Sequence, residues 1–388
     1  METPVKYSVG FDASKEEFVA AIQLVNNDQS IALKATRKFN NTAKGFYDCE
    51  YWINQHNKVA VPVVITMEAT GNYHENLAFY FNQKGHYVSV VLPNKAKKYM
   101  QSLGIKSKND TIDAKGLSQM GAEQHLAEWQ PFSPSIYELR ALTRYCEQLT
   151  STRTRLMNQL SSMEYSMFQI EEVKNGLKEL ILNTEIQIKQ IKLHIKELIR
   201  KDDKISERFD KIIPIKGLGL LSLATVIAET NGFDLFENER QLASYAGYDV
   251  IENQSGKRVG KTRISKKGNS HLRRIMHMPA LSTIRCKEPR FVKVYDRIMS
   301  RTTIKMKAYV AIQRKLLCLI YSLWKKNEKY DPDYEVTTGN AGAEVLFPHG
   351  FGETIKKVGG INPPTQDELP YNAFAGESSF RDANIISI

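Results

Sequence analysis

The stretch "KYSVGFDAS", residues 6–14, predicts an apolar β-strand that ends at an acidic residue, Asp12. The stretch "FVAAIQLV", residues 18–25, predicts a second strand after a tight turn, and residues 31–39 predict a third, antiparallel to its neighbour. Four further segments alternate between helix and strand: 42–57, 61–69, 72–85 and 86–93. This order predicts an α/β domain with a mixed sheet, which we place at residues 1–132.

Four carboxylates accompany these elements. Asp12 closes the first strand, Glu68 closes the strand in "VVITMEATG", and Asp110 and Asp113 stand one helical turn apart in "KSKNDTIDAKG". If the two strands are neighbours and the helix packs across their end, the four carboxylates converge. Their oxygen atoms suit Mg²⁺ or Mn²⁺, and two such ions about 4 Å apart can assist phosphodiester chemistry. The alternative for the helical pair is two solvated charges that neutralise neighbouring lysines.

The order of these acids is informative: one on the first strand, one on the fourth, and a pair after the fifth. This layout resembles the RNase H-like nuclease fold, in particular the Holliday-junction resolvase RuvC. The resemblance implies that the four acids are metal ligands and catalytic residues. It also implies that Lys106 and Lys108 contact phosphates beside the metal centre.

Residues 133–208 have a helical composition. Glycine occurs there only at Gly176, and proline is absent after Pro134. A stripe of mostly apolar residues repeats at spacings of three and four, typical of a coiled-coil region: Ile181, Thr184, Ile188, Ile191, Ile195 and Leu198. Asn175 and Gly176 predict a turn between two antiparallel helices. A hairpin within one chain and a coiled coil between two chains both remain open, and the second would make a dimer.

The chain has 54 Lys and Arg against 43 Asp and Glu, a net charge of +11. Residues 331–388 hold nine acids and three bases, so the basic excess lies in the preceding body. Such a body suggests a polyanionic partner, most often nucleic acid, although an ordinary basic soluble protein is the alternative. Residues 329–388 are rich in Gly, Pro, Asn and acids, and we expect a largely disordered tail.

The four cysteines are far apart in the sequence, which predicts reduced thiols and neither a zinc knuckle nor a disulfide framework. The N-terminus lacks the layout of a signal peptide. No apolar run approaches the length of a membrane span. We therefore expect a cytoplasmic protein without a membrane partner.

Residues 209–328 predict a third, helical domain with two phosphate-binding features. The stretch "IIPIKGLGLLSLATVIAE" has a glycine turn between helices, a helix–hairpin–helix arrangement in which Gly217 and Gly219 would offer backbone N–H groups to a phosphate. The stretch at 254–274, "QSGKRVGKTRISKKGNSHLRR", contains eight bases and no acid, as expected of a phosphate-gripping loop. Those bases are Lys257, Arg258, Lys261, Arg263, Lys266, Lys267, Arg273 and Arg274. A plain core turn and a solvated loop are the alternatives.

Together these segments resemble the insertion-sequence one-ten family of transposases, which includes the Piv DNA invertases. The resemblance rests on "IPIKGLG", "LASYAGY", Ser255-Gly256 and "ISKKGNSHLRR" in that order, with the N-terminal acids before them. It covers roughly residues 5–325, and "IPIKGLG" is one residue longer than the family's usual turn. The implied fold class is α/β plus all-α: a RuvC-like mixed-sheet domain, a helical region and a helical transposase domain.

The resemblance implies a DNA recombinase in which Ser255 attacks a phosphodiester, assisted by the acid-bound ions. A covalent phosphoserine would conserve bond energy, so that no ATP is needed. The family further implies an active site shared between protomers, hence a homodimer or tetramer, and in some members a structured bridge RNA that selects the element ends and target DNA. Ser265 and Ser270 are rival nucleophiles, and for Ser270 we expect a helix-capping role.

Three other functions are compatible with parts of this pattern. One is a metal-dependent junction resolvase that uses water as the nucleophile. Another is an actin-like or sugar-kinase ATPase, because "VGFDAS" resembles the first phosphate loop of that class, but no second Gly-rich element follows. The third is a nucleic-acid-binding protein that retained the fold without activity.

Overall fold

The computed structural model describes residues 3–69, 71–105, 107, 109–252, 254–255, 258–260 and 262–332; for 254–255 and 258–259 only the backbone is described. The predicted tail therefore lies outside the described residues from position 333 onward. No helix in the described ranges combines the length and the apolar character that a membrane crossing requires.

A five-stranded mixed sheet forms the N-terminal part, as the sequence predicted. Its strands are β1 (Pro4–Ala13), β2 (Glu17–Asn26), β3 (Ile31–Asn40), β4 (Val63–Glu68) and β5 (Tyr87–Val91), in the order β3-β2-β1-β4-β5. The first three strands form an antiparallel meander, whereas β4 runs parallel to both β1 and β5. The two acid-bearing strands, β1 and β4, are therefore neighbours.

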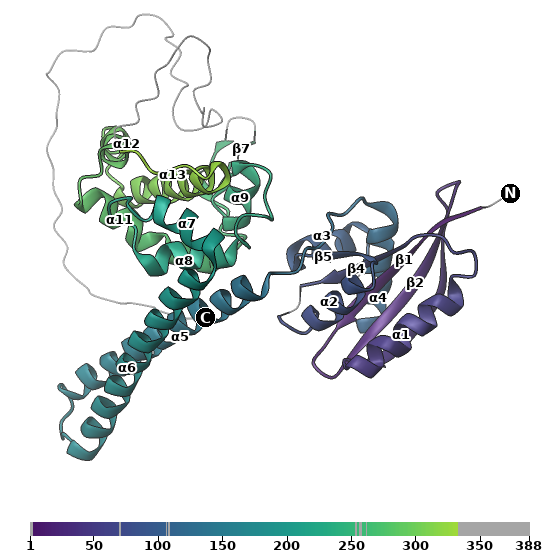
Figure 1. Ribbon diagram of the computed structural model, residues 1–388, viewed down its shortest axis with the longest axis horizontal. Helices are drawn as coiled ribbons and strands as arrows, with labels where there is room; N and C mark the ends of the chain where they lie inside the picture. Colours follow the sequence, from purple (N-terminus) through teal and green to yellow (C-terminus); the bar gives the residue numbers. More distant parts are fainter. Residues whose placement is uncertain are drawn as a thin grey trace, which may run out of the picture. The chain divides into compact units, whose positions relative to one another are not determined.

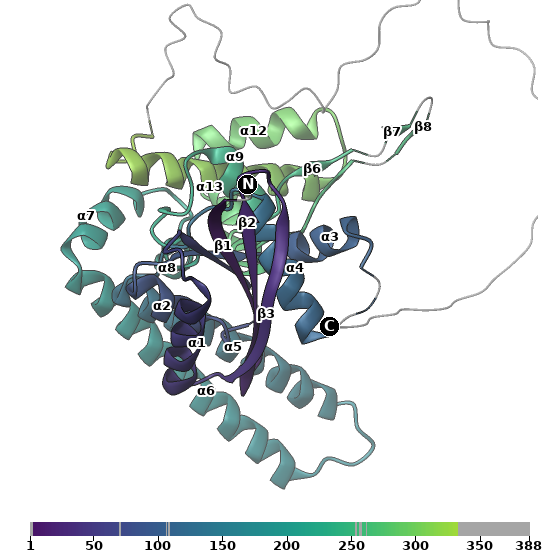
Figure 2. The same cartoon turned by 90° about the vertical axis from the view of Figure 1, so that its right-hand side faces the viewer.

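Helices cover both faces of this sheet. One face packs against α1 (Ala43–His56) and α2 (Glu75–Gln83) in an aromatic core that includes Phe11, Phe18 and Phe81. The other face contacts α4 (Asp110–Glu123), which in turn contacts α3 (Pro93–Ser102). Figure 2 shows α1 and α4 on opposite sides of the strands. The alternation of residues along β1 decides which side chains face α4.

The backbone of α4 approaches β1 very closely at Gly10. A Cβ atom at Gly10 would lie 2.1 Å from the Ala114 carbonyl oxygen and 2.2 Å from the Ser118 nitrogen. The Ser8 hydroxyl donates a 2.6 Å hydrogen bond to the Ser118 carbonyl, and Gly121 packs against the Ser8 and Thr66 hydroxyls. Only glycine at position 10 permits this spacing, so the contact fixes the height and direction of α4 over the sheet.

The next region is a helical hairpin made of α5 (Pro134–Met163) and α6 (Glu171–Lys201), which lie side by side (Figure 1). Thr184, Ile188, Ile195 and Leu198 of the predicted stripe are buried. Of the two alternatives left open by the sequence, the stripe is thus used within the chain. The predicted turn at Asn175–Gly176 is wrong, because both residues lie inside α6. The acids Glu171 and Glu172 in the first turn favour a helix that starts earlier, and one internal glycine costs a helix only about 1 kcal/mol.

Seven shorter helices complete the C-terminal domain. They are α7 (Asp203–Ile212), α8 (Leu220–Glu229), α9 (Glu239–Ala246), α10 (Ser270–Ile275), α11 (His277–Arg285), α12 (Pro289–Met299) and α13 (Lys305–Lys326). Their core surrounds α13, in which Ile312, Leu316 and Ile320 are fully buried. Ile136 and Leu139 of α5 and Ile195 of α6 belong to the same core. The base of the hairpin is thereby fixed to this domain.

The Gly10 contact makes a stability prediction. Gly10→Ala forces a methyl group into the α4 backbone and should lower the free energy of unfolding by about 3 kcal/mol. Gly176→Ala is the matched control, because its Cβ meets no atom within 4 Å in the middle of α6 and should raise stability by about 1 kcal/mol. Urea denaturation of both variants measures the two effects. Equal stability of the two variants would contradict the close approach.

Candidate active site

The first cluster of predicted site residues lies at one end of the sheet. Phe11 of β1 pairs with Met67 of β4 in parallel register, so Asp12 and Glu68 occupy adjacent positions one residue further on. Asp12 shares its face of β1 with Ser8 and Gly10, the residues that contact α4. Both carboxylates therefore project from the face that α4 covers.

The start of α4 reaches the same end of the sheet. Position 8 of β1 contacts residues 118 and 121, whereas position 10 contacts residues 114–118, so α4 runs opposite to β1. Two strand residues span about 6.6 Å, which corresponds to about four helical residues. One further step of the same size along β1, from position 10 to Asp12, corresponds to the first turn of α4, which contains Asp110 and Asp113. The Asn109 side chain fixes this helix start by accepting a 2.8 Å hydrogen bond from the Ile112 N–H.

The register thus places Asp12 beside Glu68 at one end of the sheet, and α4 begins with Asp110 and Asp113; Asp12, Glu68 and Asp113 are half-buried and Asp110 is exposed. In the part of the chain that the structure describes, no three side chains among His, Cys, Asp and Glu stand close enough to coordinate one ion. The donor set itself, four carboxylates without nitrogen or sulfur, fits a hard divalent cation. Metal binding by these four residues stays a prediction. Lys106 and Lys108 lie outside the described residues.

The predicted serine loop is a β-hairpin in the structure. Its base pairs β6 (Val250–Ile251) with β9 (Arg263–Ile264), and its outer part pairs β7 (Gln254–Ser255) with β8 (Arg258–Val259). Figure 2 shows β7 and β8 projecting from the helical domain. Ser255 pairs with Arg258, so it is the last strand residue before the two-residue connection at the tip.

The basic residues around Ser255 are only partly described. Gly256, Lys257 and Lys261 lie outside the described residues, as do the side chains of Ser255 and Arg258. Arg263, Lys266 and Lys267 are exposed at the base of the hairpin. The rival Ser265 accepts a hydrogen bond from the Lys267 N–H at 3.3 Å. The capping role predicted for Ser270 is wrong, because the preceding Asn269 caps α10 by accepting from the Leu272 N–H at 3.1 Å.

The hairpin emerges from a tightly bonded junction between two sequence motifs, "LASYAGY" and "ISKKGN". The Asn269 N–H donates to the Tyr245 carbonyl at 2.7 Å, and the Ser265 N–H donates to the Asp249 carbonyl at 2.7 Å. Gly247 adopts a left-handed conformation with φ 74°. A Cβ atom at Gly268 would lie 2.3 Å from the Tyr245 carbonyl oxygen. The two glycines therefore permit the close backbone contact from which both arms of the hairpin start.

Beneath this junction lies a buried carboxylate, Glu229, which the sequence analysis did not identify. It ends α8, and its side chain is 0% exposed. Arg144 of α5 donates to both of its oxygens, at 2.6 and 2.9 Å, and the Asn269 amide donates at 2.7 Å. The only sequence signal was an acid at the end of an apolar helix, whereas its partners lie 85 and 40 residues away.

Two of the predicted nucleic-acid contacts have partners within the protein. The Arg273 guanidinium donates to the Ala246 carbonyl at 2.8 Å and to the Asn269 carbonyl at 3.2 Å, which braces the same junction. Arg274 forms an ion pair with Glu147 of α5. His271 contacts the other oxygen of the Glu147 carboxylate at 2.5 Å. These residues attach α10 to α5, and their contact with nucleic acid stays a prediction.

The two glycines of the turn between α7 and α8 have different environments. Gly217, at φ 90°, packs against the backbone of α11, where a Cβ atom would lie 2.5 Å from the Thr283 nitrogen. Gly219 is the N-cap residue of α8, and no atom lies within 4 Å of the place of its missing Cβ. Gly217 thus has a packing role. Gly219 leaves the helix N-terminus open, and phosphate binding there stays a prediction.

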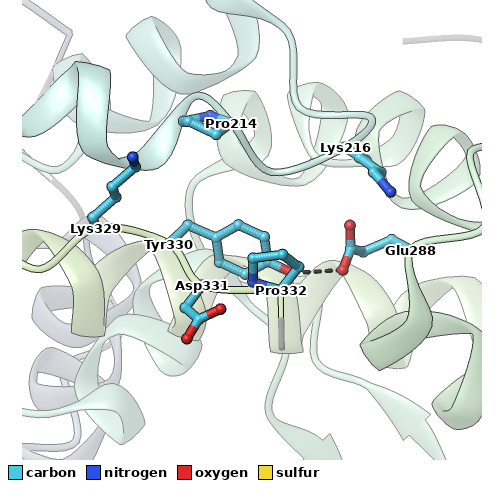
Figure 3. Close-up of a pocket in the computed structure, with 7 residues that line it drawn as sticks. All are labelled: Pro214, Lys216, Glu288, Lys329, Tyr330, Asp331 and Pro332. Atoms are coloured by element: carbon cyan, nitrogen blue, oxygen red, sulfur yellow. Dashed lines mark hydrogen bonds between the residues drawn. The ribbon is translucent and has the colours of Figure 1, made fainter. Parts of the chain in front are cut away.

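A pocket of about 440 Å³ lies beside this turn (Figure 3). Lys216, Lys329, Glu288 and Asp331 contribute two positive and two negative charges to its lining. The buried Glu288 carboxylate accepts a 2.5 Å hydrogen bond from the Tyr330 hydroxyl. This bond ties the chain after α13 to the start of α12. Balanced charge gives the pocket no preference for a phosphate.

Comparisons with known proteins give matches in both the N-terminal and the C-terminal part of the chain. Residues 9–168 match a family model described as "Transposase", of the DEDD type, and residues 210–296 match one described as "Transposase IS116/IS110/IS902 family". A pilin gene-inverting protein of Moraxella bovis is 30% identical over 331 residues, which cover 84% of this chain and 98% of the relative. A transposase for insertion sequence element IS1111A of Coxiella burnetii is 22% identical over 291 residues, 69% of this chain and 79% of the relative.

The Glu229 network predicts how stability depends on pH. Burial alone raises the pKa of Glu229, but the hydrogen bonds from Arg144 and Asn269, together with the positive charges of Arg144 and Arg140, outweigh it and hold the pKa below its ordinary value. The ionised carboxylate therefore stabilises the fold above about pH 4.3, and this contribution is lost as the pH falls through the lowered pKa. Glu229→Gln should cost about 3 kcal/mol at pH 7, with a smaller cost below pH 4.

Urea denaturation between pH 7 and pH 3 measures this difference. Glu185→Gln is the control, because Glu185 pairs with Arg153 on the surface and such pairs contribute at most about 1 kcal/mol. A pH-independent difference between Glu229→Gln and the native chain would contradict the ionised state.

Proposed function

This chain belongs to the IS110/IS116/IS902 family of transposases and is an enzyme of the transposase and DNA-recombinase class, and on that premise we propose that it cuts and rejoins the DNA of an insertion sequence through a serine nucleophile assisted by divalent metal. The observation that carries the proposal is the placement of the acids. Asp12 and Glu68 lie side by side near the ends of adjacent parallel strands, and Asp110 and Asp113 lie in the first turn of α4, which packs on the same sheet.

The family suggests dependence on a divalent metal, and we propose Mg²⁺ or Mn²⁺ held by Asp12, Glu68, Asp110 and Asp113. Such ions, when bound, supply charge stabilisation at the reacting phosphate and lower the pKa of an attacking hydroxyl. The protein's own contribution is to orient the carboxylates through the Gly10 contact, which sets where the first turn of α4 lies above the strand ends.

The proposed nucleophile is the Ser255 hydroxyl. Its oxygen attacks a DNA phosphorus atom, the bond from phosphorus to a deoxyribose oxygen breaks, and that oxygen leaves as a free DNA hydroxyl. A hydroxyl of a second strand then attacks the phosphoserine, which restores the serine and joins the strands. The number of phosphoester bonds is unchanged at each step, so the reaction needs no nucleotide hydrolysis. The hairpin supports this role because β7, which ends at Ser255, and β8 project from the helical domain (Figure 2).

The remaining assignments concern partners. The relatives' names imply a DNA substrate, and we propose that Gly219 and the bases of the serine hairpin contact phosphates. We further propose a structured guide RNA and a homodimer or tetramer that joins the acids of one protomer with the serine of another. The net charge of +11 supports a polyanionic partner of either kind.

The serine assignment is tested by covalent capture of DNA. Ser255→Ala should abolish the protein–DNA adduct and change DNA affinity by less than about twofold, because the hydroxyl is small and makes a bond only during reaction. Ser265→Ala and Ser270→Ala are matched controls that should retain the adduct. Denaturing gels of labelled element ends provide the measurement. Cleavage by Ser255→Ala without an adduct would favour water as the nucleophile and overturn the proposal.

The metal assignment is tested by binding as well as activity. Asp12→Asn and Asp113→Asn should each reduce cleavage by at least about 100-fold and weaken Mn²⁺ binding in calorimetry, since each removes a negative oxygen ligand. Asp28→Asn is a suitable control, because Asp28 lies in the turn between β2 and β3 and binds Ser30. Native cleavage and native Mn²⁺ affinity in both site variants would exclude this metal site.

A further inference from the structure

Ser255 lies far along the hairpin from its base. It is five residues beyond Val250, the first paired residue of the hairpin base. At about 3.3 Å per residue, the distance between the two residues is at most about 17 Å. A tilt of about 5° at the base would move the tip by about 1.5 Å over that length. A displacement of about 1 Å of a reacting group can lower a rate on the order of 100-fold. The alignment of Ser255 therefore depends on how firmly the base is held.

The base of the hairpin is short. Among the described residues, two pairs connect β6 and β9, and a two-stranded ribbon of this length is not stable by itself. The direction of the ribbon is set by the residues that precede β6 and follow β9. There the Lys266 backbone N–H donates to the Gly247 carbonyl at 3.1 Å, and the Asn269 backbone N–H donates to the Tyr245 carbonyl at 2.7 Å. Asn269 is thus the residue at which the returning arm of the hairpin enters α10.

The Asn269 side chain links this junction to the buried carboxylate. Its amide nitrogen donates to Glu229 at 2.7 Å and lies 3.3 Å from the Tyr245 hydroxyl, while its amide oxygen caps α10. The Tyr245 hydroxyl in turn donates to the Glu229 carbonyl at 3.2 Å. Arg144 completes the network from α5 and neutralises the carboxylate. Four separate elements therefore meet at one hydrogen-bonded centre.

We propose that Glu229, Asn269, Tyr245 and Arg144 form a positioning network that aligns the serine hairpin for strand cleavage. The inference rests on the proposed role of Ser255. Glu229, Asn269, Tyr245 and Arg144 are joined by hydrogen bonds, and Arg140 Nε lies 3.8 Å from the same carboxylate. Breaking one of these buried bonds leaves a polar group uncompensated, which favours a single arrangement. The network also joins the hairpin to α5, so a shift of α5 on binding nucleic acid would reach Ser255 through Arg144 and Glu229.

Asn269→Asp is the most specific test. The new carboxylate still accepts the capping hydrogen bond of α10, but it replaces the amide donor with a charge that repels Glu229. At saturating DNA, the rate of adduct formation should fall about 100-fold, while DNA affinity should change by less than about twofold. Asn238→Asp is the matched control, because Asn238 caps α9 in the same way on the surface, and it should leave the rate unchanged.

A reciprocal exchange distinguishes positioning from general damage. In the double variant Asn269→Asp with Glu229→Gln, the glutamine amide can donate to the new carboxylate, and the total charge of the network is that of the native chain. We expect this variant to recover at least tenfold of the lost rate. If the double variant folds but recovers none of the lost rate of adduct formation, the positioning role of the network is wrong.

Hydrogen exchange supplies a readout that does not depend on the chemistry of Ser255. The backbone amides of Ser265, Lys266 and Asn269, which bond across the junction, should exchange faster in Asn269→Asp and return toward native rates in the double variant. Native hydrogen-exchange rates at these amides in Asn269→Asp would contradict the inference. If the native chain forms no serine adduct, the proposed function fails while the exchange data still decide whether the network holds the hairpin.

Tyr245→Phe serves if Asn269→Asp does not fold. The phenyl ring keeps the packing against Phe236, whose ring centroid is 5.1 Å away, and only the hydroxyl that joins Glu229 and Asn269 is lost. Adduct formation should then slow by about fivefold to tenfold, with faster exchange at the junction. A native rate together with native exchange would count against the network.

Discussion

The close backbone contact between β1 and α4 is the constraint on which the acidic site depends. Gly10 has no Cβ, and this allows the Ala114 carbonyl and the Ser118 nitrogen to approach the strand directly. Because Ser8 and Gly121 continue the same contact, α4 runs opposite to β1. That direction brings the helix start, with its two aspartates, to the strand ends that carry Asp12 and Glu68. The contact contains none of the four acids, yet it sets the direction of the helix that carries two of them.

A second constraint acts in the C-terminal domain, where a buried ion pair supports the base of the serine hairpin. Burying Glu229 is costly unless its charge is neutralised and its oxygens are bonded. Arg144 and Asn269 meet both conditions. The same bonds connect α5 and α8 to the junction of the two motifs. The buried Glu229 carboxylate thus holds together elements that are distant in the sequence.

Several features were readable from the sequence because they depend on local periodicity. The apolar alternation of residues 6–14 and the apolar run of residues 18–25 predicted β1 and β2, and the spacing of apolar residues predicted α6. The turn at Asn175–Gly176 was wrong because favourable helical neighbours tolerate one glycine. The serine region appeared as a loop, since four strands of two residues each are too short to give an alternating pattern.

The sequence by itself determined the family, the acids and the candidate serine, because these depend on residue type and order along the chain. The positions 12, 68, 110 and 113 could be chosen before any contact was known. The tertiary structure alone decided that β1 and β4 are parallel neighbours in register, and that Glu229 meets Asn269. The physical reason is that strand pairing and burial of charge join residues tens of positions apart, and no local pattern records those partners.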